Sequence, residues 1–309
     1  MSFVGLDARG VGETAERAFL SLPFARDAAF ESVYSYLVVD EPAVHLMPLH
    51  FCPAEARRSV GVDALHALGV AAKLEYARSR WVDEVVDAGG GASLISVHRL
   101  HDALLALVND RYSEALGDTA GSFVPTLADL HARHAMSLAL DGSPSRSAGR
   151  ALDFEDYMEH ARARHGPYRA PVDAVLLLAG ASADVLQKAT ASWHSWAFGV
   201  QLYDDAVDVE EDFGARNRSW TVWRALGDMK RGMGLAGASA ADSDAFYEMA
   251  LSRGAIFETL RRAEAFFRDA ARTSEGRFPS WVSVQRACIY QTRRLREDLQ
   301  ALSPGSGST

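Results

Sequence analysis

Two groups of aspartates have a spacing that could bind a metal ion. Asp83 and Asp87 are four residues apart, and Asp204, Asp208 and Asp212 repeat that interval. On an α-helix, residues four apart share one face and lie about 6 Å apart along the axis. Carboxylates at this spacing repel one another unless a cation lies among them, and Mg²⁺ prefers such oxygen ligands. Asp-x-x-x-Asp alone is common on helix surfaces, so the prediction depends on both groups facing each other.

The second group continues a helix face that is apolar upstream. Trp193, Ala197 and Val200 precede the acidic run on that face. A helix face that is apolar in its N-terminal part and anionic at its C-terminal end predicts the wall of a pocket with a cation site at the mouth of that pocket. The alternative is a solvated acidic helix end, which is disfavoured because aspartates at a helix C-terminus oppose the macrodipole.

The elements that must position these residues are helices, because apolar residues recur at intervals of three and four nearly throughout. Strand signals are few. We expect one all-α domain, 1–302, a bundle of about ten helices, followed by a disordered Gly/Ser-rich tail, 303–309. The predicted helices cover 55–88, 99–116, 124–140, 152–164, 170–190, 191–213, 243–271 and 278–302.

Composition excludes several classes of protein. With 48% apolar and 24% charged residues the chain is globular rather than disordered. A net charge of -9 disfavours nucleic-acid binding. No apolar run approaches the roughly 20 residues of a membrane span, and the N-terminus resembles no secretory signal. The only cysteines, Cys52 and Cys288, fit a reduced, cytoplasmic protein.

The histidines show no metal-binding spacing of the His-x-x-x-His or Glu-x-x-His kind. His131 and His134 are three apart on one predicted helix and lack a nearby carboxylate partner. We therefore interpret them as ordinary helix residues.

The acidic motifs resemble those of the class I isoprenoid synthase superfamily, which includes terpene cyclases, prenyl diphosphate synthases and squalene/phytoene synthases. Asp83-Glu84-Val85-Val86-Asp87 looks like the first aspartate-rich motif of that superfamily. The run from Asp204 to Asp212 resembles both the Asp-Asp-x-x-Asp of elongating synthases and the three-ligand spacing of cyclases. The resemblance implies an all-α bundle around a central apolar cavity. There, Mg²⁺, expected as three ions, would bridge both motifs to the diphosphate of an allylic substrate.

Basic residues extend the resemblance. Arg162 and Gly166 occupy the spacing at which cyclases place a diphosphate-sensing arginine and a glycine at a helix break, and Pro167 makes such a break plausible. Arg293 and Arg294 lie in the region where cyclases place a diphosphate-binding Arg-Tyr pair. An ordinary basic helix end and a solvated basic face are the respective alternatives.

The resemblance also implies an apolar cavity that shields a carbocation from water. Its predicted wall is aromatic and small apolar residues near the two motifs, with plain core packing as the alternative for each. These residues are Tyr76, Trp81, Trp193, Trp196, Ala197 and Val200.

The leading hypothesis is a terpene cyclase, a lyase that ionises a C10–C20 prenyl diphosphate and cyclises or rearranges the cation. The first alternative is a prenyltransferase of the same superfamily, by squalene/phytoene-like coupling or prenylation of a non-isoprenoid acceptor. Simple chain elongation is weakened because the Gly-Lys…Arg site and the arginine pair after the first motif are missing; His98-Arg99 is the nearest basic pair. A non-catalytic helical binding protein is the second alternative. Substrate chain length, product and oligomeric state, including a homodimer, stay open.

Overall fold

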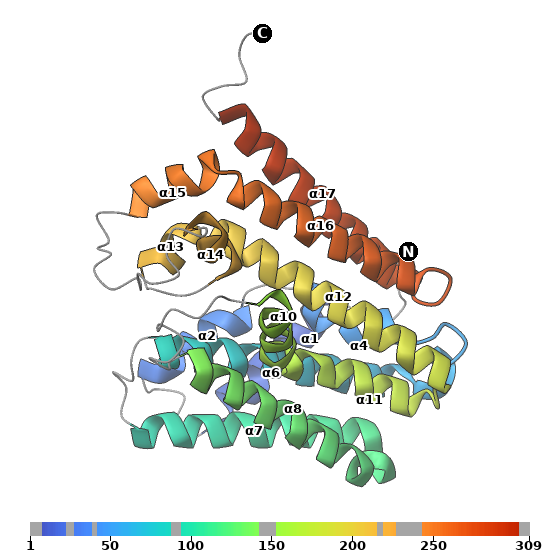
Figure 1. Cartoon of the computed structure of the whole chain (residues 1–309). Helices are drawn as coiled ribbons and strands as arrows, with labels where there is room; N and C mark the ends of the chain where they lie inside the picture. Colours follow the sequence, from blue (N-terminus) through green and yellow to red (C-terminus); the bar gives the residue numbers. More distant parts are fainter. Residues whose placement is uncertain are drawn as a thin grey trace. The chain divides into compact units, whose positions relative to one another are not determined.

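The computed structural model describes residues 8–22, 28–38, 42–87, 94–141, 153–214, 219–226 and 243–302. Within these ranges all regular secondary structure is helical (Figure 1), so the predicted all-α fold is confirmed. The backbone divides into two compact units. Unit 1 comprises Met1–Leu138, Arg164–Ala189 and Gly276–Trp281, and unit 2 comprises Ala139–Ala163, Thr190–Glu275 and Val282–Thr309. The predicted tail 303–309 lies outside the described residues.

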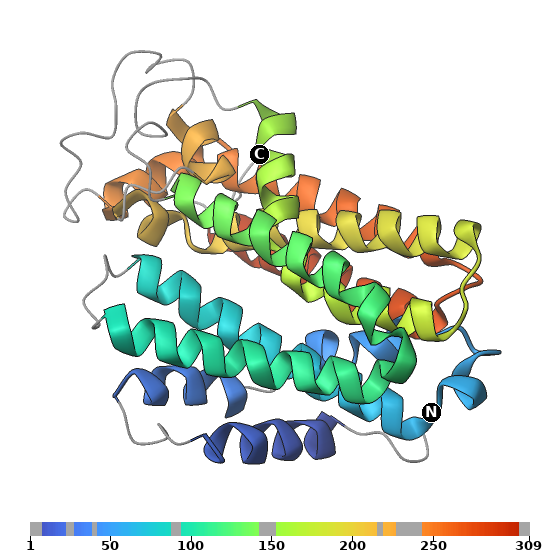
Figure 2. The same ribbon diagram turned by 90° about the horizontal axis from the view of Figure 1, so that it is seen from below.

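Unit 1 is built around the long helix α6. Its helices are α1 (Ala8–Leu20), α2 (Ala28–Val38), α3 (Pro42–His45), α4 (Met47–Phe51), α5 (Arg57–Val60), α6 (Val62–Asp87), α7 (Leu94–Leu116), η1 (Gly117–Thr119), α8 (Ala120–Asp141), η2 (Gly166–Arg169) and α11 (Ala170–Leu178). α6 and α7 lie side by side (Figure 2), and α1 and α2 also pack on α6. Leu68 and Leu74 on α6 and Leu104 on α7 are fully buried. This packing fixes the face that α6 presents to α8.

Unit 2 contains the helices that carry the second acidic motif and those that pack around them. They are α10 (Phe154–Arg164), most of α12 (Ala183–Val207), α13 (Val209–Gly214), α14 (Trp220–Leu226), α15 (Ser243–Ser252), α16 (Ala255–Ser274) and most of α17 (Pro279–Leu302). Val209 and Phe213 are buried in a core cluster with Val222, Phe246 and Ile256. The rings of Phe213 and Phe246 stack at 3.8 Å, and this anchors α13.

A glycine sets how closely α12 and α16 pack. A Cβ atom at Gly199 would lie 2.6 Å from the ring of Phe267. Real Cβ atoms do not approach other atoms that closely, so the phenylalanine ring occupies the space that any side chain at position 199 would need.

The predicted helix boundaries fail where glycines adopt positive φ. The predicted helix 55–88 is divided at Gly61 (φ 83°), and the predicted break at 190 lies instead near Gly180 (φ 58°). Residues with a Cβ rarely adopt this conformation, which ends a right-handed helix. The predicted helix 243–271 is likewise two helices, α15 and α16, and α8 begins four residues before the predicted start at 124.

Candidate active site

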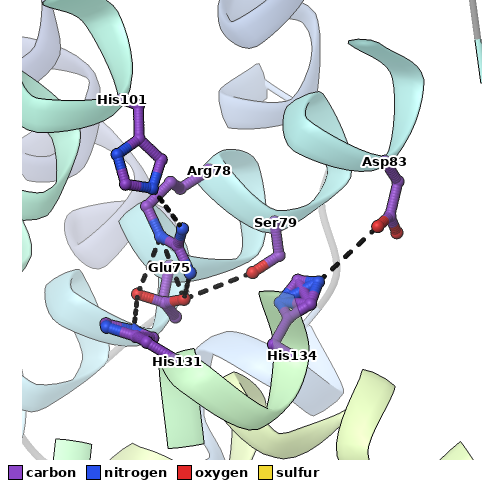
Figure 3. Close-up of polar contacts among 7 residues, drawn as sticks. All are labelled: Glu75, Arg78, Ser79, Asp83, His101, His131 and His134. Carbon is purple, nitrogen blue, oxygen red and sulfur yellow. Dashed lines mark hydrogen bonds and ion pairs between the residues drawn. The ribbon is translucent and has the colours of Figure 1, made fainter. Parts of the chain in front are cut away.

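One face of α6 carries a row of polar residues: Glu75, Arg78, Ser79 and Asp83 (Figure 3). Intervals of three and four place them on the same side of the helix. All four are buried, with Glu75 fully inaccessible and Asp83 9% exposed. Buried polar groups are costly unless they have partners. α7 and α8 supply these partners.

Glu75 is the centre of this network. Its carboxylate accepts hydrogen bonds from Arg78 Nη2 at 2.5 Å and from Ser79 Oγ at 3.2 Å. His131 Nε2 on α8 lies 3.2 Å from the other carboxylate oxygen, and Arg78 Nη1 lies 3.1 Å from His101 Nε2 on α7. Burial alone would raise the pKa of Glu75, but Arg78 and His131 outweigh burial and hold that pKa well below its ordinary range. Glu75 is therefore a permanent anion that ties α6 to α8.

Asp83, one of the predicted metal ligands, lies two turns further along the same face. Its Oδ1 atom faces His134 Nε2 at 3.6 Å, and its Oδ2 atom faces Arg164 Nη2 at 3.6 Å. Both distances exceed those of ordinary hydrogen bonds. Burial, aided by Arg78, lowers the pKa of His134 to about 4, so this imidazole is neutral near pH 7. Asp83 thus adjoins a neutral imidazole and a cationic guanidinium, and Arg78 and Arg80 also interact with it electrostatically.

The interpretation of His131 and His134 as histidines without a carboxylate neighbour is wrong. Both point from α8 toward α6, where His131 meets Glu75 and His134 meets Asp83 (Figure 3). The partners are far apart in the sequence, so a search for nearby carboxylates misses them. The sequence offered no signal for these pairs, because two turns of α6 separate the two acids whereas only one turn of α8 separates the two histidines.

The other predicted residues of unit 1 differ in accessibility. Asp87 is the last residue of α6, and its side chain lies outside the described residues. Trp81 is buried, at 2% exposure. Tyr76 is half-buried, and its ring lies 5.9 Å from the ring of Tyr168. Tyr76 therefore belongs to an aromatic cluster about two turns before Asp83.

The second acidic motif, in unit 2, retains its predicted one-turn spacing across a bend. α12 ends at Val207, but the amide of Asp208 donates to Asp204 O and the amide of Asp212 donates to Asp208 O, each at 2.8 Å. Asp204 and Asp208 are exposed, and Asp212 is half-buried. The three carboxylates therefore stand one turn apart, as predicted, and two of them are open to solvent.

Asp205, which the sequence did not single out, has a different role from its neighbours. It is 3% exposed and accepts hydrogen bonds from the Tyr157 hydroxyl, from Gln201 Nε2 at 2.9 Å and from the backbone amide of Trp220 at 2.6 Å. Burial raises its pKa to about 7, against the opposing effect of these donors. Asp205 holds the start of α14 and does not face solvent as Asp204 does. The sequence signal for this role was the adjacency of two aspartates, which on a helix must point in different directions.

Arg162 and Gly166 lie on either side of a helix end. α10 ends at Arg164 and η2 begins at Gly166, so the predicted break is confirmed. Arg162 donates to Glu159, and its guanidinium lies 5.2 Å from the ring centroid of Phe198. Arg164, two residues later, is the arginine that approaches Asp83.

Arg293 and Arg294 make ion pairs within unit 2. Arg293 donates to Glu264, a buried residue that also pairs with Arg268 at 2.5 Å and with Arg296 at 2.8 Å. Arg294 lies 3.8 Å from Asp298 on the exposed side of α17. A role for either in binding diphosphate requires these pairs to open.

The predicted wall residues of α12 lie in the interior of unit 2. Trp193 and Ala197 are fully buried, Trp196 is 5% exposed, and Val200 is half-buried. The rings of Trp193 and Trp196 are 6.3 Å apart. The exposure of Trp193, Trp196 and Ala197 is that of core residues, and contact of any of the four side chains with a substrate stays a prediction.

The described residues contain neither a preformed metal cluster nor a helix suited to a membrane. No group of three or more His, Cys, Asp or Glu side chains in these ranges is arranged to hold a metal ion by itself. None of the helices in these ranges combines the length and the apolar character needed to cross a membrane.

Comparison with known proteins gives a fold and no closer relative. No protein-family model and no curated protein matches the sequence. Among solved structures, geranylgeranyl pyrophosphate synthetase from the archaeon Geoglobus acetivorans matches with a TM-score of 0.73 and 15% identity, over 91% of this chain and 97% of its own. A polyprenyl synthase from Roseobacter denitrificans matches with a TM-score of 0.72 and 16% identity, over 92% of this chain and 95% of its own.

A third structure includes bound species. A polyprenyl synthase from Caulobacter crescentus CB15, described as complexed with calcium and isoprenyl diphosphate, matches with a TM-score of 0.65 and 17% identity. The match covers 95% of this chain and 100% of the Caulobacter crescentus chain. These similarities establish the all-α isoprenoid synthase fold for nearly the whole chain.

Proposed function

We propose that this chain is a Mg²⁺-dependent prenyltransferase that ionises an allylic prenyl diphosphate and transfers the prenyl cation to an acceptor. One coincidence carries the proposal. The fold is like that of prenyl diphosphate synthases, and the chain has an aspartate motif at the end of α6 and another at the end of α12. The alternative hypothesis from the sequence thus has better support than the leading one, a terpene cyclase.

The residues proposed to hold Mg²⁺, three ions in all, are Asp83 and Asp87 with Asp204, Asp208 and Asp212. Carboxylate oxygens suit this ion, which usually keeps several waters and is completed by substrate phosphates. A site completed by water and substrate phosphates agrees with the described residues, among which no three side chains already form a metal-binding cluster. When bound, Mg²⁺ would neutralise the negative charge of the leaving diphosphate.

The proposed reaction begins with cleavage of the bond between C1 of the prenyl chain and the diphosphate oxygen. The electron pair leaves with diphosphate, and the allylic cation is then attacked by the π electrons of an acceptor, which afterwards loses a proton. Arg164 is the residue best suited to steady the leaving group, because its guanidinium adjoins Asp83 and its side chain is 29% exposed. Arginine binds phosphate oxygens with two hydrogen bonds at once. Arg162 would contribute a second positive charge once its hydrogen bond to Glu159 opens.

The cation must be protected from water and can be stabilised by aromatic faces. Tyr76 with Tyr168 in unit 1, and Trp193 with Trp196 in unit 2, are the aromatic pairs proposed for this task. The small and apolar side chains of Ala197 and Val200 would leave space for a prenyl chain.

A terpene cyclase is the second candidate, favoured by one specific observation. The one-turn spacing of Asp204, Asp208 and Asp212 is the three-ligand spacing of cyclases, and it persists through the junction of α12 and α13. A cyclase needs no acceptor, which agrees with the missing sequence features of an isopentenyl diphosphate site.

The test is incubation with geranyl, farnesyl and geranylgeranyl diphosphate plus Mg²⁺, with and without isopentenyl diphosphate, followed by assay of diphosphate and organic products. A prenyltransferase releases diphosphate faster when its acceptor is present and yields a longer or coupled product. Cyclic hydrocarbon formed without an acceptor would support the cyclase instead. Absence of diphosphate release with every substrate, with or without Mg²⁺, would overturn both.

A further inference from the structure

His134 is a buried polar residue to which the proposed reaction assigns no task. Its side chain is 4% exposed, and its Nε2 atom has no hydrogen-bond partner in the described part of the chain. The ring points from α8 directly at Asp83 (Figure 3). A buried imidazole nitrogen without a hydrogen bond is costly, so its orientation calls for a partner.

The distance between the two atoms limits what that partner can be. His134 Nε2 and Asp83 Oδ1 are 3.6 Å apart. This separation is too long for a hydrogen bond. It is short enough for a single divalent cation, with bonds of about 2.1 Å to nitrogen and oxygen, to reach both atoms.

Neighbouring contacts hold the histidine in this orientation. His131, one turn earlier on α8, lies 3.2 Å from Glu75, whose carboxylate is fixed by Arg78. This contact sets α8 against α6 at Glu75, two turns before Asp83. The two ligand atoms are thus positioned by the fold before any ion arrives.

We propose that His134 is a nitrogen ligand of the cation held by Asp83, which makes the first acidic motif a mixed nitrogen and oxygen site that prefers Co²⁺ to Mg²⁺. The inference rests on the proposed function, because it takes Asp83 to be a metal ligand. Imidazole suits first-row metals such as Fe²⁺, Ni²⁺ and Zn²⁺, and the affinity of nitrogen-containing sites rises from Mn²⁺ to Co²⁺, whereas Mg²⁺ prefers oxygen. Water and diphosphate oxygens would complete the coordination shell.

The experiment is pulsed EPR of the full chain loaded with Mn²⁺, alone and with inorganic diphosphate, to detect nitrogen nuclei bonded to the metal. The wild-type protein should show this coupling, and His134→Gln should lose it. His98→Gln is the matched control, because His98 is an exposed histidine on α7 of the same unit; it should retain the coupling. By calorimetry, H134Q should bind Mn²⁺ at least about 10-fold more weakly, a loss typical of disturbed metal sites.

Mn²⁺ bound to wild-type protein without nitrogen coupling would overturn the proposal, as would a coupling that survives H134Q. Where H134Q fails to fold, His134→Asp offers an all-oxygen site, which should lose the coupling and move the preference toward Mg²⁺. Failure of the inference is distinct from failure of the proposed function. An oxygen-only metal site with Mg²⁺-dependent diphosphate release leaves the prenyltransferase intact and removes only the nitrogen ligand.

Discussion

A buried carboxylate lies on the same helix as each acidic motif, and the two carboxylates are stabilised in opposite ways. Glu75, behind Asp83, is surrounded by Arg78 and His131, and its pKa lies below the ordinary range. Asp205, beside Asp204, meets only neutral donors, from Tyr157, Gln201 and the Trp220 amide, and burial raises its pKa to about 7. Both are acids out of reach of solvent. The difference shows that the charge of the partners, more than burial, decides whether such an acid stays ionised.

The proposed ligands of the two motifs also differ in burial. In unit 1 the proposed ligand Asp83 is itself buried and held between two side chains. In unit 2 the proposed ligands Asp204 and Asp208 are exposed, whereas Asp205 is buried and accepts three hydrogen bonds. We therefore expect the first motif to be preorganised and the second to be ordered mainly by the ions and diphosphate it binds.

The largest expected effect is on catalysis. Asp83→Asn and Asp208→Asn should each lower Mg²⁺-dependent diphosphate release by about 10²–10³-fold or more, the usual cost of removing charge stabilisation at a reacting centre. Steady-state assay with the preferred prenyl diphosphate measures this. Asp129→Asn, an exposed aspartate on α8, is the control and should change little. Retention of full activity by D208N would remove the second motif from the reaction.

The next effect is on the stability of unit 1. Glu75→Gln should lower the free energy of unfolding by about 3–5 kcal/mol, because Arg78 is left as a buried charge without its counter-ion. Urea denaturation measures the change. Glu13→Gln, which breaks an exposed pair with Arg9, should cost less than about 1 kcal/mol. A cost for E75Q as small as that of the control would contradict the anchoring role of the network.

A smaller loss is expected in unit 2. Asp205→Ala should cost about 1–3 kcal/mol, since it strands the buried amide of Trp220 and the hydroxyl of Tyr157. Tyr157→Phe, which removes only one donor, should cost about 1 kcal/mol. The same denaturation experiment applies to both. If D205A were as costly as E75Q, the distinction between charged and neutral partners would fail.

The smallest effect is a difference in pH dependence. Asp205 has a folded pKa of about 7, above an unfolded value of about 3.9; its contribution to stability is therefore greatest below about pH 4 and declines as the pH rises toward 7. Glu75 has a lowered folded pKa, so its contribution is complete above about pH 4.3 and is lost on acidification below that value. Unfolding free energies of wild type minus D205N, and wild type minus E75Q, measured across this range, should have these opposite trends. If both differences in unfolding free energy changed with pH in the same direction, the opposite pKa shifts of Asp205 and Glu75 would be contradicted.

The sequence predicts the helices and the positions of both motifs because these depend on local intervals. Asp83 falls near the end of α6, and Asp204, Asp208 and Asp212 keep their one-turn spacing across the bend after α12. Boundaries at Gly61 and Gly180 were missed because a glycine in a helical pattern gives no local sign of whether its φ is positive.

The partners of the site were not predictable, because they depend on the register of one helix against another. Nothing within α8 indicates that His134 meets Asp83, or that Arg164 rather than Arg162 lies beside it. Arg293 resembled a diphosphate ligand in sequence, but Glu264, 29 residues earlier, accepts its hydrogen bond. A single sequence contains the types of these residues and not their distances.

The second acidic motif is carried by a helix whose seating depends on a missing methyl group. Because the ring of Phe267 fills the space above Gly199, even alanine at position 199 would push α12 away from α16 or force that ring to turn. Such a shift would be passed along the rigid helix to Asp204, little more than one turn away. A residue with no side chain therefore helps to set where these carboxylates lie, and under the proposed function a change there would be measured as weaker metal binding.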